Sequence, residues 1–122
     1  MKPGAIGWRR VRDATRYTAR GLNAAWRYES AFRQELLLAV LLTPSAFWLG
    51  RSLQETALLL ATLAFVLAIE LLNSAIEAVV DRASPEQNEL AGRAKDMGSA
   101  AVFVSLCTVV AVWSLVAFDR FG

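Results

Sequence analysis

The chain contains the stretch Glu70-Leu-Leu-Asn-Ser-Ala-Ile-Glu-Ala-Val-Val-Asp81, in which polar residues recur at helical spacing within an apolar segment. At about 100° per residue, the polar positions 70, 73, 74, 77 and 81 fall within about 100° of one helix surface. The carboxylates on this stripe repel one another unless a proton, a cation or a basic neighbour relieves the repulsion. We therefore predict that the stripe binds a metal ion or transfers a proton. A solvated face of a surface helix is the simpler alternative.

The composition is that of a membrane protein. Hydrophobic residues make up 56% of the 122 residues, and they form long apolar runs of the kind found in transmembrane helices. We expect one domain over residues 1–122 and no cleavable signal, so that the mature protein is the whole chain. The only cysteine, Cys107, excludes an intrachain disulfide, and the lack of histidine removes the commonest general base and zinc ligand.

The amino-terminal segment predicts an amphipathic surface helix over about residues 6–28. Five of its arginines share one face with Asn23, namely Arg9, Arg12, Arg16, Arg20 and Arg27, and mostly small or apolar residues take the opposite face. Trp8, Tyr17 and Trp26 are aromatic residues suited to a membrane interface, so we expect the helix to lie in the headgroup layer with its arginines toward anionic phosphate. Nucleic-acid binding is the alternative, but a membrane already accounts for the charge.

Three further helices, over about residues 30–50, 52–83 and 90–119, are predicted to span the membrane. The first contains Pro44, which we expect to kink it, and Arg51 to Glu55 is expected to be a tight turn. Ser84-Pro85 ends the second helix. The third includes residues 97–118, which carry no charged side chain. The predicted fold class is thus an all-α membrane protein with three transmembrane helices and one surface helix.

The distribution of positive charge predicts the orientation. Of the 13 Lys and Arg residues, all but Arg51 and Arg120 lie in the amino-terminal segment or in the connection between the second and third spans. By the positive-inside rule, the amino terminus is cytoplasmic and the carboxyl terminus is on the outer, periplasmic side. Three boundaries between charged and apolar sequence then meet at the cytoplasmic interface. We expect one site there, made of Glu29, Glu35, Glu70, Glu77, Lys95 and Asp96.

These residues allow phosphate chemistry without naming a reaction. Oxygen ligands such as Glu29, Glu77 and Asn73 suit Mg²⁺ bound beside phosphate. Glu70, at the apolar boundary, is placed to act as a base. No Gly-rich phosphate loop of the Walker type and no soluble-kinase signature is present.

Several segments resemble the small prokaryotic diacylglycerol kinases over almost the entire chain. They are Ala24-Ala25-Trp26 with Glu29, Ala31-Phe-Arg-Gln-Glu35, the stretch from Glu70 to Arg82, and Gly92-Arg-Ala-Lys-Asp-Met-Gly-Ser-Ala-Ala101. The chain departs from the family pattern at Asn23, where a basic residue is common, at Asn88, where histidine is expected, and at Ser84-Pro85.

The resemblance implies a homotrimer in the bacterial inner membrane that transfers the γ-phosphate of ATP to diacylglycerol and forms phosphatidic acid. Glu70 would be the general base, and Glu29 and Glu77 would hold Mg²⁺ with the nucleotide. The residues implied to contact ATP are Arg10, Tyr17, Glu29, Asn73, Glu77, Glu86, Gln87, Asn88, Lys95 and Asp96. Those implied to border the lipid substrate are Arg10, Asn23, Ala24, Ala25, Trp26, Ala31, Glu35, Trp48, Glu70, Ser99 and Trp113.

Other interpretations remain open at this point. Each of these roles has a packing alternative. Lys95 can be an interfacial lysine and Asn73 an amide that joins helices. Trp48 and Trp113 can be anchors in an aromatic belt. A polyprenol such as undecaprenol is an alternative substrate, because related Gram-positive proteins phosphorylate it. A proton- or cation-coupled transporter and a membrane scaffold are the alternatives from other classes.

Overall fold

A computed structural model describes residues 6–86 and 88–122, which form four α-helices and no β-strand. The helices are α1 (Trp8–Tyr28), α2 (Ser30–Leu49), α3 (Leu53–Ala83) and α4 (Glu89–Phe121). Their bounds lie within two residues of the predicted ranges. The all-α fold class is therefore confirmed.

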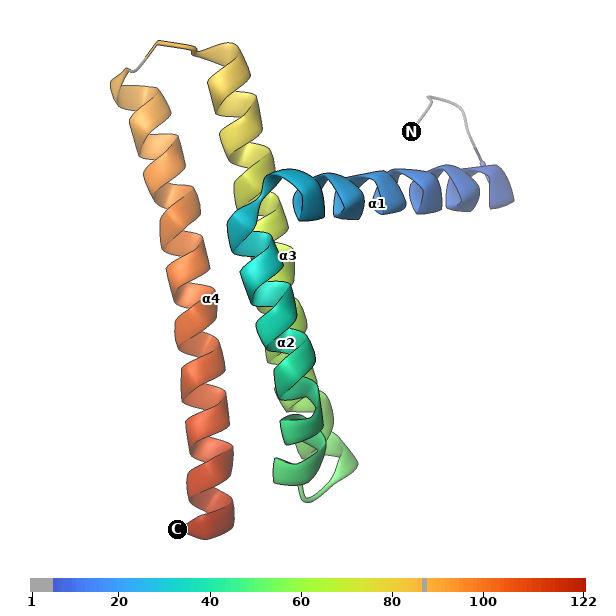
Figure 1. Cartoon of the computed structure of the whole chain (residues 1–122), viewed down its shortest axis with the longest axis vertical. Helices are drawn as coiled ribbons and strands as arrows, with labels where there is room; N and C mark the ends of the chain where they lie inside the picture. The colour runs from blue at the N-terminus through green and yellow to red at the C-terminus, as the bar shows by residue number, and fades with distance from the viewer. Residues whose placement is uncertain (1–5, 87) are drawn as a thin grey trace.

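Helices α2, α3 and α4 form a bundle, and α1 projects sideways from it (Figure 1). Glu29 is the only residue between α1 and α2, and its extended backbone (φ −118°, ψ 103°) makes the corner between them. The buried hydrophobic core of the described bundle contains Ala46 and Leu49 of α2, Leu59 of α3 and Val116 of α4. This core lies near the turn between α2 and α3, away from the polar stripe of α3.

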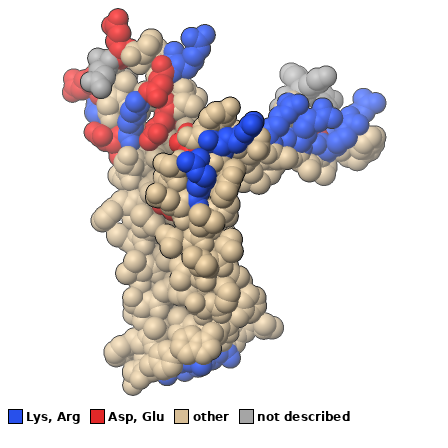
Figure 2. All heavy atoms as spheres, in the orientation of Figure 1, with Lys and Arg blue, Asp and Glu red and all other residues tan. Residues whose placement is uncertain are grey.

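The sides of the bundle are apolar, as expected for a membrane protein. Helices α3 and α4 are each long and apolar enough to cross a bilayer. At 1.5 Å per residue they extend about 45 Å and 50 Å, so both are longer than the hydrocarbon layer of about 30 Å. Charged side chains gather where α3 and α4 are connected and along α1 (Figure 2).

The starts of α3 and α4 are capped by side chains. The Ser52 hydroxyl accepts a hydrogen bond from the Glu55 amide (3.1 Å), and Asn88 Oδ1 accepts one from the Ala91 amide (2.8 Å). The prediction of a turn from Arg51 to Glu55 was wrong in extent, because the Ser52 cap starts α3 at Leu53. Gly50 permits the short turn, since a Cβ there would lie 2.3 Å from Thr56 Oγ1. α2 continues through Pro44 to Leu49.

A group of polar contacts, here called the carboxyl-terminal clasp, ties the end of α4 to the turn between α2 and α3. Arg51 bridges Glu55 (3.3 Å) and Asp119. Arg120 donates to the carbonyl of Leu49 (3.0 Å) and to that of Trp48, and its guanidinium lies 5.0 Å from the Trp48 ring centroid. The last carbonyls of α2 thereby receive donors from α4.

Candidate active site

Two residues of the polar stripe of α3, Glu70 and Asn73, are buried against the other helices. Glu70 and Asn73 are only 5% and 8% exposed. Buried polar groups of this kind need partners, because losing water without a replacement contact is costly. The simpler interpretation of a solvated face therefore fails at these two positions.

Glu35 of α2 provides the first partner. Its carboxyl group lies close enough to that of Glu70 for the two to act on each other electrostatically. One Glu35 oxygen, Oε2, is buried and has no hydrogen-bond partner within the described ranges. Two carboxyl groups this close repel when both are ionised, and one retained proton removes the repulsion. The arrangement can therefore hold and pass a proton.

Asn73 links the stripe to α4. Its Nδ2 donates to Glu77 Oε1 at 3.3 Å, which turns the side-chain oxygen toward Gly98. That oxygen is buried and unpaired among the residues that the structure describes. A Cβ at position 98 would lie 2.1 Å from it. Glycine at this position is what allows the amide to fit between the two helices.

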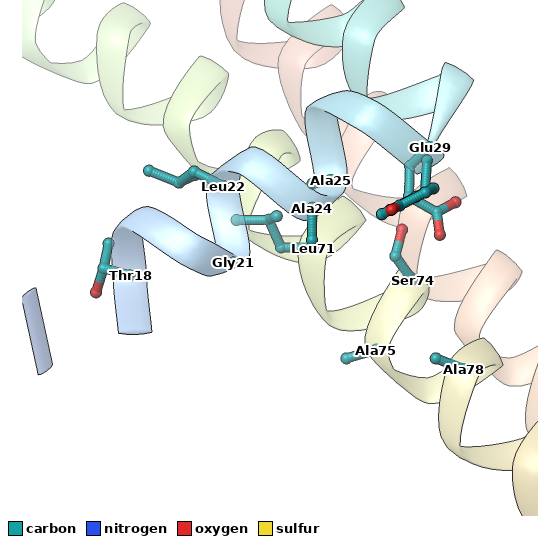
Figure 3. A pocket seen from close by; sticks show the side chains of 11 residues that line it. Thr18, Gly21, Leu22, Ala24, Ala25, Glu29, Leu71, Ser74, Ala75 and Ala78 are labelled. Carbon is teal, nitrogen blue, oxygen red and sulfur yellow. The ribbon is translucent and has the colours of Figure 1, made fainter. Parts of the chain in front are cut away.

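Glu29 approaches the same stripe from the corner between α1 and α2. Its charge and that of Glu77 both act on Glu70 electrostatically. Glu29 also lines a pocket of about 630 Å³ between α1 and α3. Figure 3 shows Glu29 and Ser74 at the same end of this pocket and Thr18 at the other. The rest of its lining is mostly small side chains.

A second pocket, of about 190 Å³, lies between α2, α3 and α4. Among the described residues that line it, Glu35 is the only charged one, and the others are aliphatic: Leu38, Ala39, Leu42, Leu63, Val66, Leu106, Val109 and Val110. The pocket thus combines an apolar interior with the carboxyl group of Glu35. Such a cavity suits an apolar molecule that carries one polar group.

Lys95 pairs with Asp81 across the ends of α3 and α4, with Nζ and Oδ1 2.5 Å apart. Glu77 also acts on Lys95 electrostatically. The helical periodicity of α3 placed Asp81 on the stripe, but it gave no register with α4 and so missed this ion pair. Asp96, next along α4, is exposed.

The oxygen atoms of the site fit a hard divalent cation. Glu29 and Glu77 supply carboxylates, and the Asn73 side-chain oxygen is buried without a partner inside the described segments. No three acidic, histidine or cysteine side chains in residues 6–86 and 88–122 come close enough to hold a metal by themselves. Mg²⁺ commonly uses one or two carboxylates together with substrate phosphates. The donor set matches that mode of binding.

Comparisons with known proteins address the class of the site. The family model described as prokaryotic diacylglycerol kinase matches residues 16–117. The chain belongs to the prokaryotic diacylglycerol kinase family. It is 43% identical to the diacylglycerol kinase of Escherichia coli K12 over the full length of both chains. It is 50% identical to that of Pseudomonas aeruginosa, over 93% of this chain and 92% of the relative.

The family match confirms the resemblance and makes the chain an enzyme, a membrane kinase, rather than a transporter or scaffold. In this kinase the positions predicted for the nucleotide are divided between separate elements. Arg10 and Tyr17 lie on α1, which projects away from the bundle (Figure 1), whereas Lys95 and Asp96 lie on α4. A single chain therefore does not bring these four residues together.

The loop between α3 and α4 carries three other positions predicted for ATP. The Asn88 side chain already caps α4 and also donates to Ser84 Oγ at 2.5 Å. The Ser84 hydroxyl in turn donates to the Glu86 carbonyl at 2.8 Å. Ser84 and Asn88, two positions where the chain departs from the family pattern, thus belong to one local hydrogen-bond network. Gln87 lies outside the described residues.

The positions predicted for the lipid fall into two groups. Ala24 and Ala25 line the pocket between α1 and α3, and Glu35 lines the one between α2, α3 and α4. Asn23, Trp26 and Ala31 lie on α1 or α2 close to the corner in sequence, and Ser99 lies on α4. Trp48 and Trp113 lie toward the other end: Trp113 Nε1 donates to Thr62 Oγ1 at 2.9 Å, and Trp48 belongs to the clasp. Thr62 is about 12 Å along α3 from Glu70. The single chain does not join these two tryptophans to the acidic site.

Sequence reasoning also missed Arg33, which bridges the corner next to Glu29. Its guanidinium donates to the carbonyls of Trp26 (2.7 Å) and Arg27 (3.3 Å) at the end of α1. The basic residue one turn into α2 was a usable signal, because such residues satisfy the last carbonyls of a preceding helix.

Proposed function

We propose that the chain transfers the γ-phosphate of ATP to the hydroxyl of sn-1,2-diacylglycerol and forms phosphatidic acid at the cytoplasmic face of the bacterial inner membrane. This activity recycles diacylglycerol in phospholipid metabolism. The observation that supports the proposal most is the half-buried Glu35, which lines the apolar pocket between α2, α3 and α4, next to the buried Glu70 of α3. The hydroxyl of an alcohol with apolar tails can reach a carboxylate at this position. The Glu29 and Glu77 carboxylates lie on the side of the site nearer the charged end of the bundle.

Glu70 is the proposed general base. The lipid hydroxyl gives its proton to the Glu70 carboxylate as its oxygen attacks the γ-phosphorus, and the bond to the ADP oxygen breaks. Phosphoryl transfer depends mainly on positioning and charge stabilisation rather than on covalent help from protein. Glu35 supports Glu70, because their proximity provides a second place for the proton.

Mg²⁺ is the proposed cofactor, held by Glu29 and Glu77 together with phosphate oxygens. When bound, it offsets negative charge on the transferring phosphate. Asn73 keeps Glu77 in place through its hydrogen bond. Lys95 adds positive charge nearby, and Asp81 holds its ammonium group.

We further infer a homotrimer in which α2, α3 and α4 all cross the membrane. Helix α2 has 20 residues, enough for about 30 Å. The amino terminus is cytoplasmic and the carboxyl terminus periplasmic, from the placement of Lys and Arg. Within one chain, Arg10 and Tyr17 of α1 are separated from Lys95 and Asp96 of α4. This separation supports a trimer, because α1 of a neighbouring subunit can bring its Arg10 and Tyr17 to the nucleotide.

The test is lipid-dependent phosphorylation by the purified protein in detergent micelles with ATP and Mg²⁺. Dioleoylglycerol should be phosphorylated, and Glu70→Gln should lower kcat by about 10³-fold or more, because the base is lost while the fold is kept. Glu55→Gln, at the far end of α3, is the matched control and should retain the wild-type rate. Undecaprenol in place of dioleoylglycerol tests the other substrate. A faster rate with undecaprenol, or an active Glu70→Gln variant, contradicts the proposal.

A further inference from the structure

The corner between α1 and α2 is made by one residue that is also a predicted metal ligand. Glu29 ends α1 and precedes α2, and its own side chain makes no capping hydrogen bond at the start of α2. Its amide donates to the Ala25 carbonyl at 3.0 Å, and its carbonyl accepts from the Arg33 amide at 3.2 Å. The direction of the Glu29 carboxylate therefore depends on the angle at which the two helices meet.

Arg33 is the side chain that spans this corner. While its amide binds the Glu29 carbonyl, its guanidinium reaches back to the carbonyls of Trp26 and Arg27. These carbonyls lie at the negative end of α1, where a fixed positive charge is favoured. Phe32 (3% exposed) and Ala25 (6% exposed) bury the inner side of the same corner. The corner is thus held from both sides.

The arrangement leaves α1 standing away from α3. The pocket of about 630 Å³ lies between them, and Glu29 reaches its polar end beside Ser74 (Figure 3). A change in the corner angle would carry Glu29 away from Glu70 and Glu77, since those two carboxylates belong to α3 and do not move with α1.

We propose that Arg33 is a positioning residue, which fixes the α1–α2 corner so that Glu29 completes the cation site on α3. This inference rests on the proposed function, because it assigns Glu29 to Mg²⁺. Residues that orient a metal ligand without touching the metal commonly change metal affinity by about 10- to 100-fold.

The experiment measures Mg²⁺ dependence and backbone amide exchange in the same full-length variants. Arg33→Gln should raise the Mg²⁺ concentration for half-maximal rate by about 10-fold, while excess Mg²⁺ restores kcat and KM for dioleoylglycerol stays unchanged. Amide hydrogen exchange over residues 23–31 should become faster. Arg33→Lys keeps the positive charge but loses the two-pronged set of guanidinium N–H donors. Its Mg²⁺ dependence and its amide exchange rates should therefore lie between those of wild type and Arg33→Gln.

Arg27→Gln is the matched control, because it removes the same charge close to the corner. Within the described part of the chain, the Arg27 side chain makes no hydrogen bond or ion pair, so its Mg²⁺ dependence and amide exchange should equal those of wild type. Faster exchange in Arg33→Gln with unchanged Mg²⁺ dependence overturns the positioning role. A shifted Mg²⁺ dependence with unchanged exchange also overturns it and assigns Arg33 to direct phosphate contact. Failure of the proposed function is separate, since wild type would then lack lipid-dependent phosphorylation.

Discussion

At the scale of single residues, Asn73 of the acidic site packs closely against Gly98 of α4. The amide fits because position 98 has no side chain. The contact ties helix packing to the site, since the same amide holds Glu77.

Gly98→Ala should displace Asn73, because the new Cβ would lie 2.1 Å from its side-chain oxygen. We expect a loss of about 1–3 kcal/mol in the free energy of unfolding, as for other overpacked sites, together with a lower kcat. Thermal unfolding in detergent and the lipid kinase assay measure the two effects.

Gly92→Ala is the control on the same helix. A Cβ at position 92 meets nothing within 4 Å, so the replacement should leave activity intact and stabilise α4 by about 0.5–1 kcal/mol. Adding Asn73→Ala to Gly98→Ala should recover stability but not kcat. Equal stability of wild type and Gly98→Ala would contradict the close contact.

Individual residues also show which features of the site could be predicted from the sequence and which could not. The periodicity of α3 was enough to put Glu70, Asn73, Glu77 and Asp81 on one stripe, because residues at these spacings share a helix face whatever surrounds it. The partners of Glu70 and Asp81 depend on the register between helices. No pattern within a single helix contains that register, so the contacts with Glu35 and Lys95 required coordinates.

At the scale of elements, a partly buried hydrogen bond joins α3 to α4 toward the end of the bundle that lies away from Glu70. Thr62, 5% exposed, accepts from the Trp113 indole and donates to the Leu59 carbonyl at 2.7 Å. Thr62→Val should lower the free energy of unfolding by about 1–2 kcal/mol, because it leaves the indole N–H unpaired. Thr62→Ser should retain most of the stability. Thr108→Val is the control, since the Thr108 hydroxyl binds only its own helix, at the Val104 carbonyl.

The carboxyl-terminal clasp is a second connection between elements. Arg120→Gln removes the charged donor to the Trp48 and Leu49 carbonyls and the contact with the Trp48 ring. We expect the free energy of unfolding, measured by thermal unfolding, to fall by about 1–2 kcal/mol. The kcat should stay unchanged, because the clasp is far from Glu70. A large fall in kcat at temperatures where the variant stays folded would contradict this separation of roles.

The helices themselves were predictable from the sequence to within two residues at each end. Apolar runs, the Ser84-Pro85 break and the charged boundaries carry that information locally. The start of α3 was less clear, because Arg51 and Glu55 looked like a charged turn. The Ser52 cap and the short Gly50 turn decide it, and both depend on backbone geometry.

At the scale of the whole molecule, the proposed orientation can be tested with single cysteines in a Cys107→Ala background. Leu53 and Leu90 are both exposed, at opposite ends of the bundle. Leu53→Cys should react with a membrane-impermeant maleimide in intact spheroplasts, whereas Leu90→Cys should react only after permeabilisation. The reverse pattern would overturn the orientation.

The proposed sharing of sites between subunits predicts recovery of activity in mixed assemblies. Arg10→Glu and Glu70→Gln should each be inactive alone. Randomly mixed trimers should regain about one quarter of the wild-type rate, because one site in four pairs an intact α1 with a neighbouring intact Glu70. The two variants are unfolded together, refolded and assayed. No recovery would mean that each chain uses its own α1.

The carboxyl-terminal clasp has a consequence for biosynthesis. In the proposed orientation, the turn between α2 and α3 must be carried through the bilayer when the protein is inserted. A lone arginine at the bilayer centre costs about 2.5–3.5 kcal/mol, but Glu55 lies one helical turn from Arg51 and pairs with it. The hairpin can therefore be translocated as a nearly neutral unit, and Asp119 joins the pair when α4 follows.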